Sequence, residues 1–322
     1  MTLANRYLPY SVFLNTAGSV DAWINQVQST NLAGGVSLFE ETSGSEVDRQ
    51  YVAAKEVAPT VEIVTTDLTA LTTVGYAGVL VNCGSGTPGC TIYGRQLPLG
   101  SLPASISASD HITALISDGL MVPKRVSAGN NEVAKFQIEL HPILGTTATY
   151  SGATPIVYSN AQTISSGQTA TANIFSAGPV KFTISSGGST LLQGISQTAV
   201  DFGIQVLKET TDAEVYPSHV SIIARNARFE FTSKDPTVQA TIGDGISVSA
   251  FASYFRAVSQ NGQRVPAATT SHCKISGTAG MVTPGTFNLT HKRAGEVSYI
   301  YTPSFASTAL ITISVAAAIP TS

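Results

Sequence analysis

Charged side chains are scarce in this sequence of 322 residues. Lys, Arg, Asp and Glu together make up 11% of the chain, against about 25% in a typical soluble protein. The formal net charge is −3 at pH 7, so the chain has no basic field that would attract nucleic acid. Because charged residues are depleted where proteins contact one another, this composition is tolerable in a protein whose surface is largely covered by partners. It also suits β structure with Ser and Thr on the exposed faces.

Cysteines and long apolar runs are also few. Three cysteines do not make a disulfide framework; Cys83 and Cys90 flank a Gly-rich loop and could be bridged across a hairpin, but we expect reduced thiols. No apolar run reaches 18 residues, which argues against membrane insertion. The opening "MTLANRYLPYSVFL" lacks the features of a secretory signal, so we expect a soluble protein made in the cytoplasm.

No arrangement of residues indicates catalysis. The loop "CGSGTPGC" lacks the GK[ST] ending of a phosphate-binding loop and is interpreted as a Gly/Pro hairpin turn. His111 and His272 have no neighbouring set of metal ligands, so an edge or interface role is favoured over a metal site. Asp67 and Asp235 each precede a short helical pattern and are interpreted as caps. We therefore expect no enzyme activity, no cofactor and no metal.

The chain contains an internal repeat. "GVSLFEET" from Gly35 matches "GIQVLKET" from Gly203, and the register holds without a gap to Gly75 and Gly243, with 11 of 41 positions identical. Weaker matches extend the repeat in the same order towards both ends. This predicts a tandem duplication with a first domain over residues 1–145, a linking hairpin over 146–178, and a second domain with a C-terminal strand over 179–322.

Alternating apolar residues and β-branched residues predict that the fold is mainly β. Short helices are expected after Asp67 and Asp235, where Pro236 suits a first helical position. A further helix is predicted over residues 19–28, "SVDAWINQVQ", from apolar residues at helical spacing. The expected fold class is two tandem related β-sandwich or barrel domains with one or two short helices each.

The block "TVEIVTTDLTALTTVG", the hairpin-rich segments and the near-equal halves resemble the major tail protein, or tail tube protein, of long-tailed bacteriophages. The resemblance implies a structural virion protein located in the phage tail, which is made in the host cytoplasm. Homotrimeric rings with six similar domains would stack into a tube for passing DNA, and other tail proteins would be partners. An alternative is a capsid decoration, fibre or adhesin-type β module that binds a host surface ligand.

The resemblance also directs attention to certain charged residues. Glu62 and Glu230 occupy matching places on alternating strands and are candidates for facing a neutral to acidic channel. Basic residues would slow DNA by binding its phosphates, so we expect them at ring-to-ring or outer surfaces. The candidates for these contacts are expected in matching hairpin turns and are Lys124, Arg125, Lys292 and Arg293.

Overall fold

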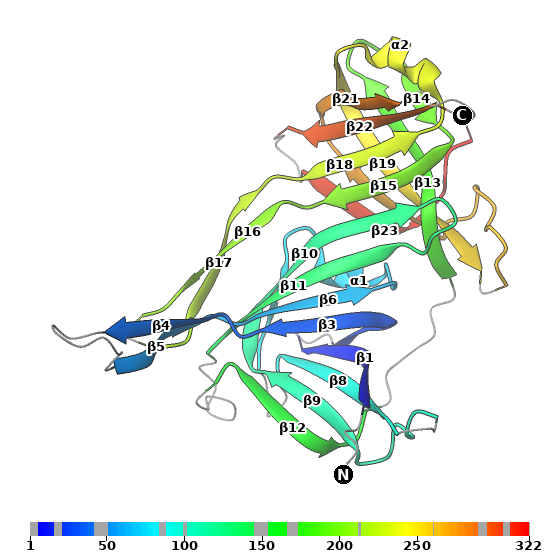
Figure 1. Ribbon diagram of the computed structural model, residues 1–322. Coiled ribbons are helices and arrows are strands. Elements are labelled where there is room, and N and C mark those ends of the chain that lie inside the picture. The colour runs from blue at the N-terminus through cyan, green and yellow to red at the C-terminus, as the bar shows by residue number, and fades with distance from the viewer. Residues whose placement is uncertain are drawn as a thin grey trace.

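The computed structural model describes residues 6–15, 21–41, 51–83, 88–98, 102–144, 154–165, 173–211, 214–259, 261–288, 295–304 and 310–321. Within them the fold is mainly β, as the sequence predicts, with antiparallel strands and two short α-helices (Figure 1). No helix among these residues is both long and apolar enough to cross a membrane.

The strands fall into two successive groups along the chain. The first group is β1 (Arg6–Asn15), β2 (Asp21–Ile24), β3 (Val27–Ala33), β4 (Val36–Glu41), β5 (Tyr51–Val57), β6 (Thr60–Thr65), β7 (Val79–Val81), β8 (Cys90–Leu97), β9 (His111–Ile116), β10 (Asp118–Gly129), β11 (Lys135–Ile143) and β12 (Ile156–Gln162). The second group is β13 (Asn173–Ile184), β14 (Ser189–Leu192), β15 (Ile195–Asp201), β16 (Ile204–Glu209), β17 (His219–Arg225), β18 (Arg228–Ser233), β19 (Ile246–Ser259), β20 (His272–Gly277), β21 (Gly280–Asn288), β22 (Glu296–Pro303) and β23 (Ile311–Ala317).

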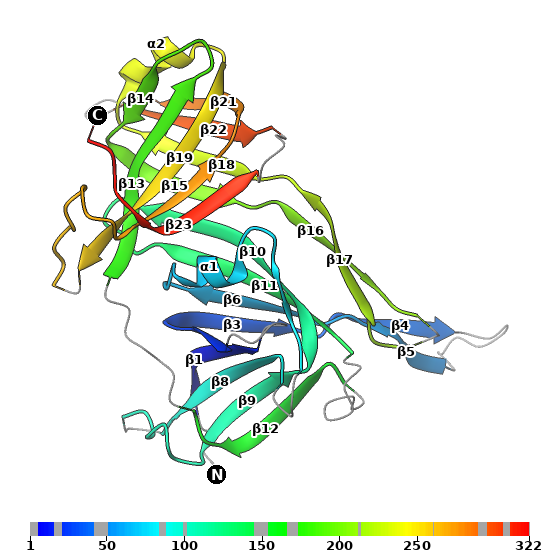
Figure 2. The same ribbon diagram turned by 180° about the vertical axis from the view of Figure 1, so that it is seen from behind.

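One large sheet runs through both halves of the chain. Its strand order is β14-β13-β19-β21-β22-β18-β15-β10-β11-β6-β3, with β7, β20 and β23 attached beside this path. A five-stranded sheet, β12-β9-β8-β1-β2, packs with it in the first half, and Figure 2 shows the same layers from behind. The hairpins β4–β5 and β16–β17 form separate two-stranded sheets, which we call arm 1 and arm 2.

Alternation along the strands decides which face is buried. In β6, Val61 and Ile63 are fully buried while Glu62 points to the other face. In β18, Phe229 and Phe231 take the buried places and Glu230 the other face. The second half has an aromatic core, in which Phe251 stacks on Tyr301 with ring centroids 4.1 Å apart and Phe229 and Phe231 pack beside them, whereas the first half is filled mainly by aliphatic side chains.

The second half repeats the strand pairing of the first. Pairing β1–β2 corresponds to β13–β14, β9–β12 to β20–β23, and β10–β11 to β21–β22. The other described pairs inside each half match in the same way. Even the irregularities recur, since the bulge after Pro123 in β10 has its counterpart after Pro284 in β21.

The expected aspartate caps are found at the turns that precede α1 and α2, whereas the N-cap residues of the two α-helices themselves are Thr69 and Val238. Asp67 Oδ1 accepts hydrogen bonds from the Thr69 backbone N at 3.0 Å and from Thr69 Oγ1 at 2.5 Å. Asp235 accepts the same two bonds from Thr237 at the same distances, and they lower the pKa of its carboxyl group. Helix α1 (Ala70–Val74) follows the first turn; a 3-10 turn, η1 (Pro236–Val238), and α2 (Gln239–Ile242) follow the second.

Two sequence predictions about local structure are wrong. The helix predicted over residues 19–28 is replaced by β2 and β3, with Gln26 at a φ of 51° in the turn between them. The segment 146–178 contributes two strands that do not pair as a linking hairpin. Of these, β12 pairs with β9 in the smaller sheet, and β13 pairs with β14 and β19 in the larger one. The domain limits themselves stay a prediction, because the large sheet passes through both halves without interruption.

The cysteines are buried and free, so Cys83 and Cys90 are not bridged. Burial raises the pKa of the Cys90 thiol far above its usual range and that of Cys273 to about 12. Residues 84–87 of the loop interpreted as a hairpin turn lie outside the described residues. The strands on either side of it do not pair with each other, because β7 pairs with β10 in the large sheet whereas β8 pairs with β1 and β9 in the smaller one. The C-terminal strand predicted from the sequence is confirmed as β23.

The turn before arm 1 supplies a test of the fold. Gly35 has a φ of +57°, and a Cβ placed there would lie 2.2 Å from the Ala58 carbonyl oxygen. We expect Gly35→Ala to lower the free energy of unfolding by about 1–3 kcal/mol, through backbone strain and displacement of the 58–60 turn. Gly34→Ala is the matched control, since its Cβ would meet only a Val36 methyl group at 3.7 Å. Equal urea-unfolding midpoints for the two variants would contradict this account.

Candidate assembly interface

The two halves meet along half of one strand. Residues Arg125–Gly129 of β10 pair antiparallel with Gln197–Asp201 of β15, and this is the only strand pairing between the halves among the described residues. Opposite one another in this pair lie Val126 and Val200, both fully buried. The bulge after Pro123 separates this stretch from the earlier part of β10, which pairs with β7. On this edge, β10 therefore pairs with β7 through its first part and with β15 through its second part.

Arm 2 strengthens this junction by crossing onto the first half (Figure 1). Lys208 Nζ donates to the carbonyl oxygens of Ala58 at 3.0 Å and Pro59 at 2.8 Å, and to Thr60 Oγ1 at 2.8 Å. Backbone bonds add to the contact, with Val57 N donating to the Val215 oxygen and Leu144 N to the Pro217 oxygen, each at 2.8 Å. At the base of the arm, Arg225 donates to the Ala77 oxygen and lies over the Tyr76 ring.

Partly buried charges and one buried histidine gather under arm 2. Burial lowers the pKa of Lys208, and the nearby carboxylates of Glu139 and Glu56 partly oppose this. His141 Nε2 lies 4.0 Å from Glu139 Oε2, and neither ring nitrogen of His141 has a hydrogen-bond partner in the described part of the chain. Burial and the positive charge of Lys208 lower the pKa of His141 to about 4. His141 is therefore neutral at neutral pH.

Sequence reasoning missed Lys208, which is the main polar anchor of arm 2. The repeat contained a signal, because Lys208 in "GIQVLKET" corresponds to Glu40 in "GVSLFEET". The charge reverses between two otherwise similar segments. Such a reversal is expected where equivalent elements meet different surroundings.

The candidate channel residues lie on one polar face of the large sheet. Glu62 and Glu230 point away from the core, as the alternation predicts. Arg125 Nη2 lies 3.6 Å from Glu230 Oε2, and Arg228 Nε lies 3.3 Å from Glu230 Oε1. On the neighbouring strands, Lys124 Nζ bonds Glu139 Oε1 at 3.2 Å. Exposed pairs of this kind contribute only about 0–1 kcal/mol each, so their main effect is to neutralise the face.

The expected position of the basic residues in hairpin turns is wrong for Lys124 and Arg125. Both lie in the middle of β10, at its bulge, where the strand pairs with β11 and then β15. The sequence could not show this because Pro123 resembles the end of a strand, whereas here it begins a bulge within one. Lys292 and Arg293 lie outside the described residues.

His111 and His272 hold equivalent loops through hydrogen bonds on both ring nitrogens. Each is fully buried at the start of its strand. His111 Nδ1 accepts from the Gln96 backbone N at 3.1 Å and its Nε2 lies 2.8 Å from the Ser105 oxygen. His272 bonds the Ala257 N and the Pro266 oxygen, both at 3.0 Å. Since Nδ1 accepts, Nε2 carries the proton in both. No cluster of three or more His, Cys, Asp or Glu is present among the described residues.

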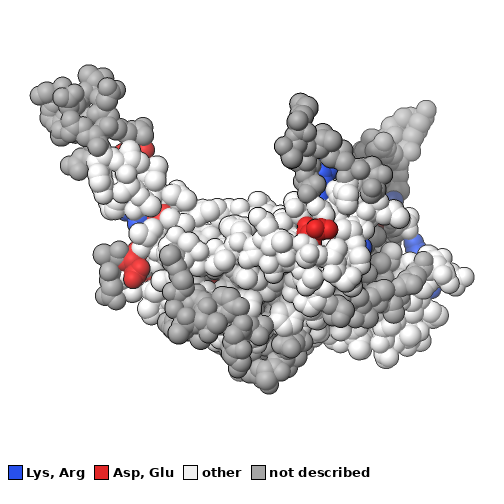
Figure 3. All heavy atoms as spheres, turned by 90° about the horizontal axis from the view of Figure 1, so that it is seen from below, with Lys and Arg blue, Asp and Glu red and all other residues white. Residues whose placement is uncertain are grey.

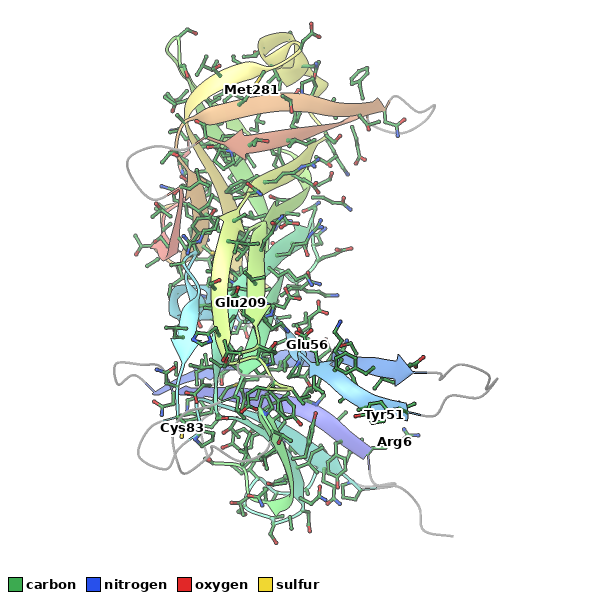
Figure 4. All side chains as sticks on the ribbon, turned by 90° about the vertical axis from the view of Figure 1, so that its left-hand side faces the viewer. Arg6, Tyr51, Glu56, Cys83, Glu209 and Met281 are labelled. Carbon is green, nitrogen blue, oxygen red and sulfur yellow. The ribbon has the colours of Figure 1, made fainter. Side chains whose placement is uncertain are left out.

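Arm 1 stands away from the molecule (Figures 1 and 4). Tyr51 lies on the part of the arm that extends beyond the body in Figure 4. The apolar side chains of this arm are about half exposed, at 49–58%: Val36, Leu38, Phe39, Tyr51 and Val52. Charged groups are sparse on the surface seen from below (Figure 3). Exposed apolar patches are common where proteins contact other molecules.

Several strand edges have no partner within the described part of the chain, and two of them correspond to the edges that meet in the internal junction. The outer edge of β3 has no strand partner, since β3 ends the large sheet. In β21, only Gly280–Val282 pair with β19, so Thr286–Asn288 are paired with β22 alone. Phe287 in this stretch is 51% exposed. Open edges readily pair with another chain.

Comparison with known proteins does not assign the chain to a family. No protein-family model matches the sequence, and no curated protein matches it.

The pKa of His141 predicts a pH dependence of stability. Between about pH 6.5 and 4 the unfolded chain binds a proton at this residue that the folded chain does not, so stability falls as the pH falls. The loss levels off below about pH 4 and amounts to about 3 kcal/mol when complete. We expect His141→Leu to remove this part of the dependence in urea unfolding measured from pH 7.5 to 4. Identical slopes for wild type and variant would exclude His141 as the cause.

The anchor of arm 2 predicts a local effect. Lys208→Met leaves the carbonyl groups of Ala58 and Pro59 without their donor, so we expect a loss of about 1–3 kcal/mol. Amide hydrogen exchange at Val57 and Leu144, which bond the end of the arm, should become faster than exchange in β22. The control is Lys135→Met, at an exposed position of β11, for which we expect a change within about 0.5 kcal/mol. Unchanged exchange at both amides in Lys208→Met would show that the lysine does not hold the arm.

Proposed function

We propose that this protein is a structural virion protein that polymerises as stacked rings into a phage tail tube, and that it has no catalytic role. The observation that carries this proposal is that the first half has a strand edge and an arm equivalent to those that form the internal junction, and that neither is covered by other described residues. Inside the chain, the second half contributes a strand edge and an arm to the first half. The first half has the same edge and arm, β3 and arm 1, and both are open in the described part of the chain.

Such a subunit assembles head to tail. The surfaces that meet at the internal junction differ from each other, so a contact of the same kind between chains is heterologous and closes into a ring if its rotation allows. Three chains would present six similar halves around one axis. This supports a homotrimeric ring with pseudo-sixfold symmetry as the building block of the tube.

The polar face of the large sheet suits a channel for DNA. Its basic residues Lys124 and Arg125 are paired with Glu139 and Glu230, so the face has no cluster of unpaired positive charge in its described part. Several free Lys or Arg side chains would bind phosphates and retard the DNA. In the proposed tube, Glu62 and Glu230 face the channel. Arg125, which pairs with Glu230, and Lys124, which pairs with Glu139, lie on the same face, so for these two residues the proposal replaces the ring-to-ring or outer position expected from the sequence. DNA is cargo, and the remaining partners are other tail proteins of the virion.

The alternative proposal is a capsid decoration, fibre or adhesin-type module. The exposed aromatic side chains of arm 1, Phe39 and Tyr51, favour it, because aromatic residues are common in binding surfaces. A decoration or adhesin module would remain a discrete particle and bind a host glycan or protein through this arm.

Assembly of the purified protein tests the proposed function. We expect native mass spectrometry to detect trimers and negative-stain microscopy to reveal rings or tubes as the protein concentration rises. Double-stranded DNA added at about 50 mM salt should not bind tightly to the assemblies. Monomers alone at high concentration, or tight salt-sensitive DNA binding, would contradict the proposal. Monomers that bind a glycan array would favour the decoration or adhesin alternative.

A further inference from the structure

The internal repeat identifies the residues that correspond to the junction inside the chain. In β10, Val126 lies opposite Phe136 after the bulge, and in β21 Phe287 lies opposite Val297 after the equivalent bulge. In β15, Val200 lies opposite Phe229, and in β3 Leu32 lies opposite Val61. Phe287 is therefore the counterpart of Val126, and Leu32 is the counterpart of Val200.

Phe287 and Leu32 are apolar, like the two valines of the junction, but they are less buried. Val126 and Val200 meet across the two strands and are fully buried. Phe287 is 51% exposed and Leu32 is partly buried. Burying apolar side chains of this size favours association relative to leaving them exposed. The backbone groups on the same edges gain ladder hydrogen bonds at the same time.

We propose that the partner of these edges is a second copy of the chain, and that β3 of one copy pairs antiparallel with Thr286–Asn288 of the next. Leu32 lies opposite Phe287 in this pair, with Ala33 opposite Thr286 and Asn31 opposite Asn288. The register follows from the pairs Val126–Val200, Arg125–Asp201 and Ser127–Ala199. This inference rests on the proposed self-assembly and specifies the contact that produces it.

Because arm 1 is the counterpart of arm 2, the repeat also predicts where arm 1 contacts the next copy. Arm 2 reaches the 58–60 turn of the first half through Lys208. The corresponding turn of the second half is Asn226–Arg228, between β17 and β18, as 58–60 is between β5 and β6. Glu40 corresponds to Lys208 and Arg228 to Thr60. The contact between copies therefore brings opposite charges together, and the half-exposed apolar side chains of arm 1 become covered.

The two edges cannot meet within one chain. Six strands stand between β21 and β3 in the large sheet, so seven inter-strand spacings of about 4.8 Å place them roughly 34 Å apart along the sheet. A covalent link between the edges must then join two molecules. This makes disulfide formation a direct measure of the proposed register, because a disulfide needs Cα atoms about 4.4–6.8 Å apart, which directly opposite residues of paired strands satisfy.

The test is the full-length variant Leu32→Cys with Phe287→Cys, oxidised under assembly conditions. We expect disulfide-linked dimers and closed trimers on non-reducing gels, at least tenfold more than in either single variant. The three native cysteines are buried, and the single variants measure any background from them. Leu32→Cys with Thr190→Cys is the matched control, because β14 is the opposite end of the large sheet and should not link to β3.

A charge exchange tests the arm. Glu40→Lys should reduce the assembled fraction at about 50 mM salt, and adding Arg228→Glu should restore it, whereas Arg228→Glu alone should not increase it.

Tubes or rings that form without the Leu32–Phe287 link would overturn the proposed register and leave the proposed function standing. Monomers alone, with no link, would overturn both. Equal linking in the Thr190 control would also overturn the register.

Discussion

The backbone hydrogen bonds between β10 and β15 hold the two halves of the chain in one sheet. A strand edge that is buried must find partners for its amide and carbonyl groups, and β15 supplies them along the second part of β10. This is possible because the pairing of β10 with β7 ends at Met121, and the pairing with β15 begins at Arg125, after the bulge that follows Pro123. The position of arm 2, the partly buried charges beneath it and the continuous polar face all depend on this junction.

At the junction the second half contributes its strand edge and its arm to the first half, and not the reverse. This accounts for the different surroundings of the two arms. Arm 2 lies on the first half of its own chain, where Lys208 is anchored by carbonyl oxygens. Arm 1 has no equivalent half beyond it in the same chain, so its apolar side chains remain exposed. Equivalent elements therefore carry different residues, with Glu40 in place of Lys208. In the proposed assembly this difference distinguishes contacts inside a chain from contacts between chains.

The wrong predictions have a common physical cause, which is that short local patterns fit more than one structure. Trp23, Ile24 and Val27 have helical spacing, but Trp23 and Ile24 pair with Phe13 and Val12 in a short strand, and Gln26 then turns the chain. In the segment 146–178, the two strands were recognisable but their partners were not. A strand pattern specifies which residues face one way, while the choice of neighbouring strand depends on contacts far away in sequence.

The sequence by itself determined the mainly β class, the repeated block and the role of Asp67 and Asp235 at the start of their helical turns. These features depend on alternation, on register and on hydrogen bonds between residues two positions apart, all of which are local. Only the tertiary structure decided that both halves share one sheet, that Lys124 and Arg125 lie beside acids on its polar face, and that β3, Phe287 and arm 1 remain open. Those features depend on which distant strand edges meet, because a backbone edge can pair with any other edge of suitable length, and burial of the whole sheet selects among them.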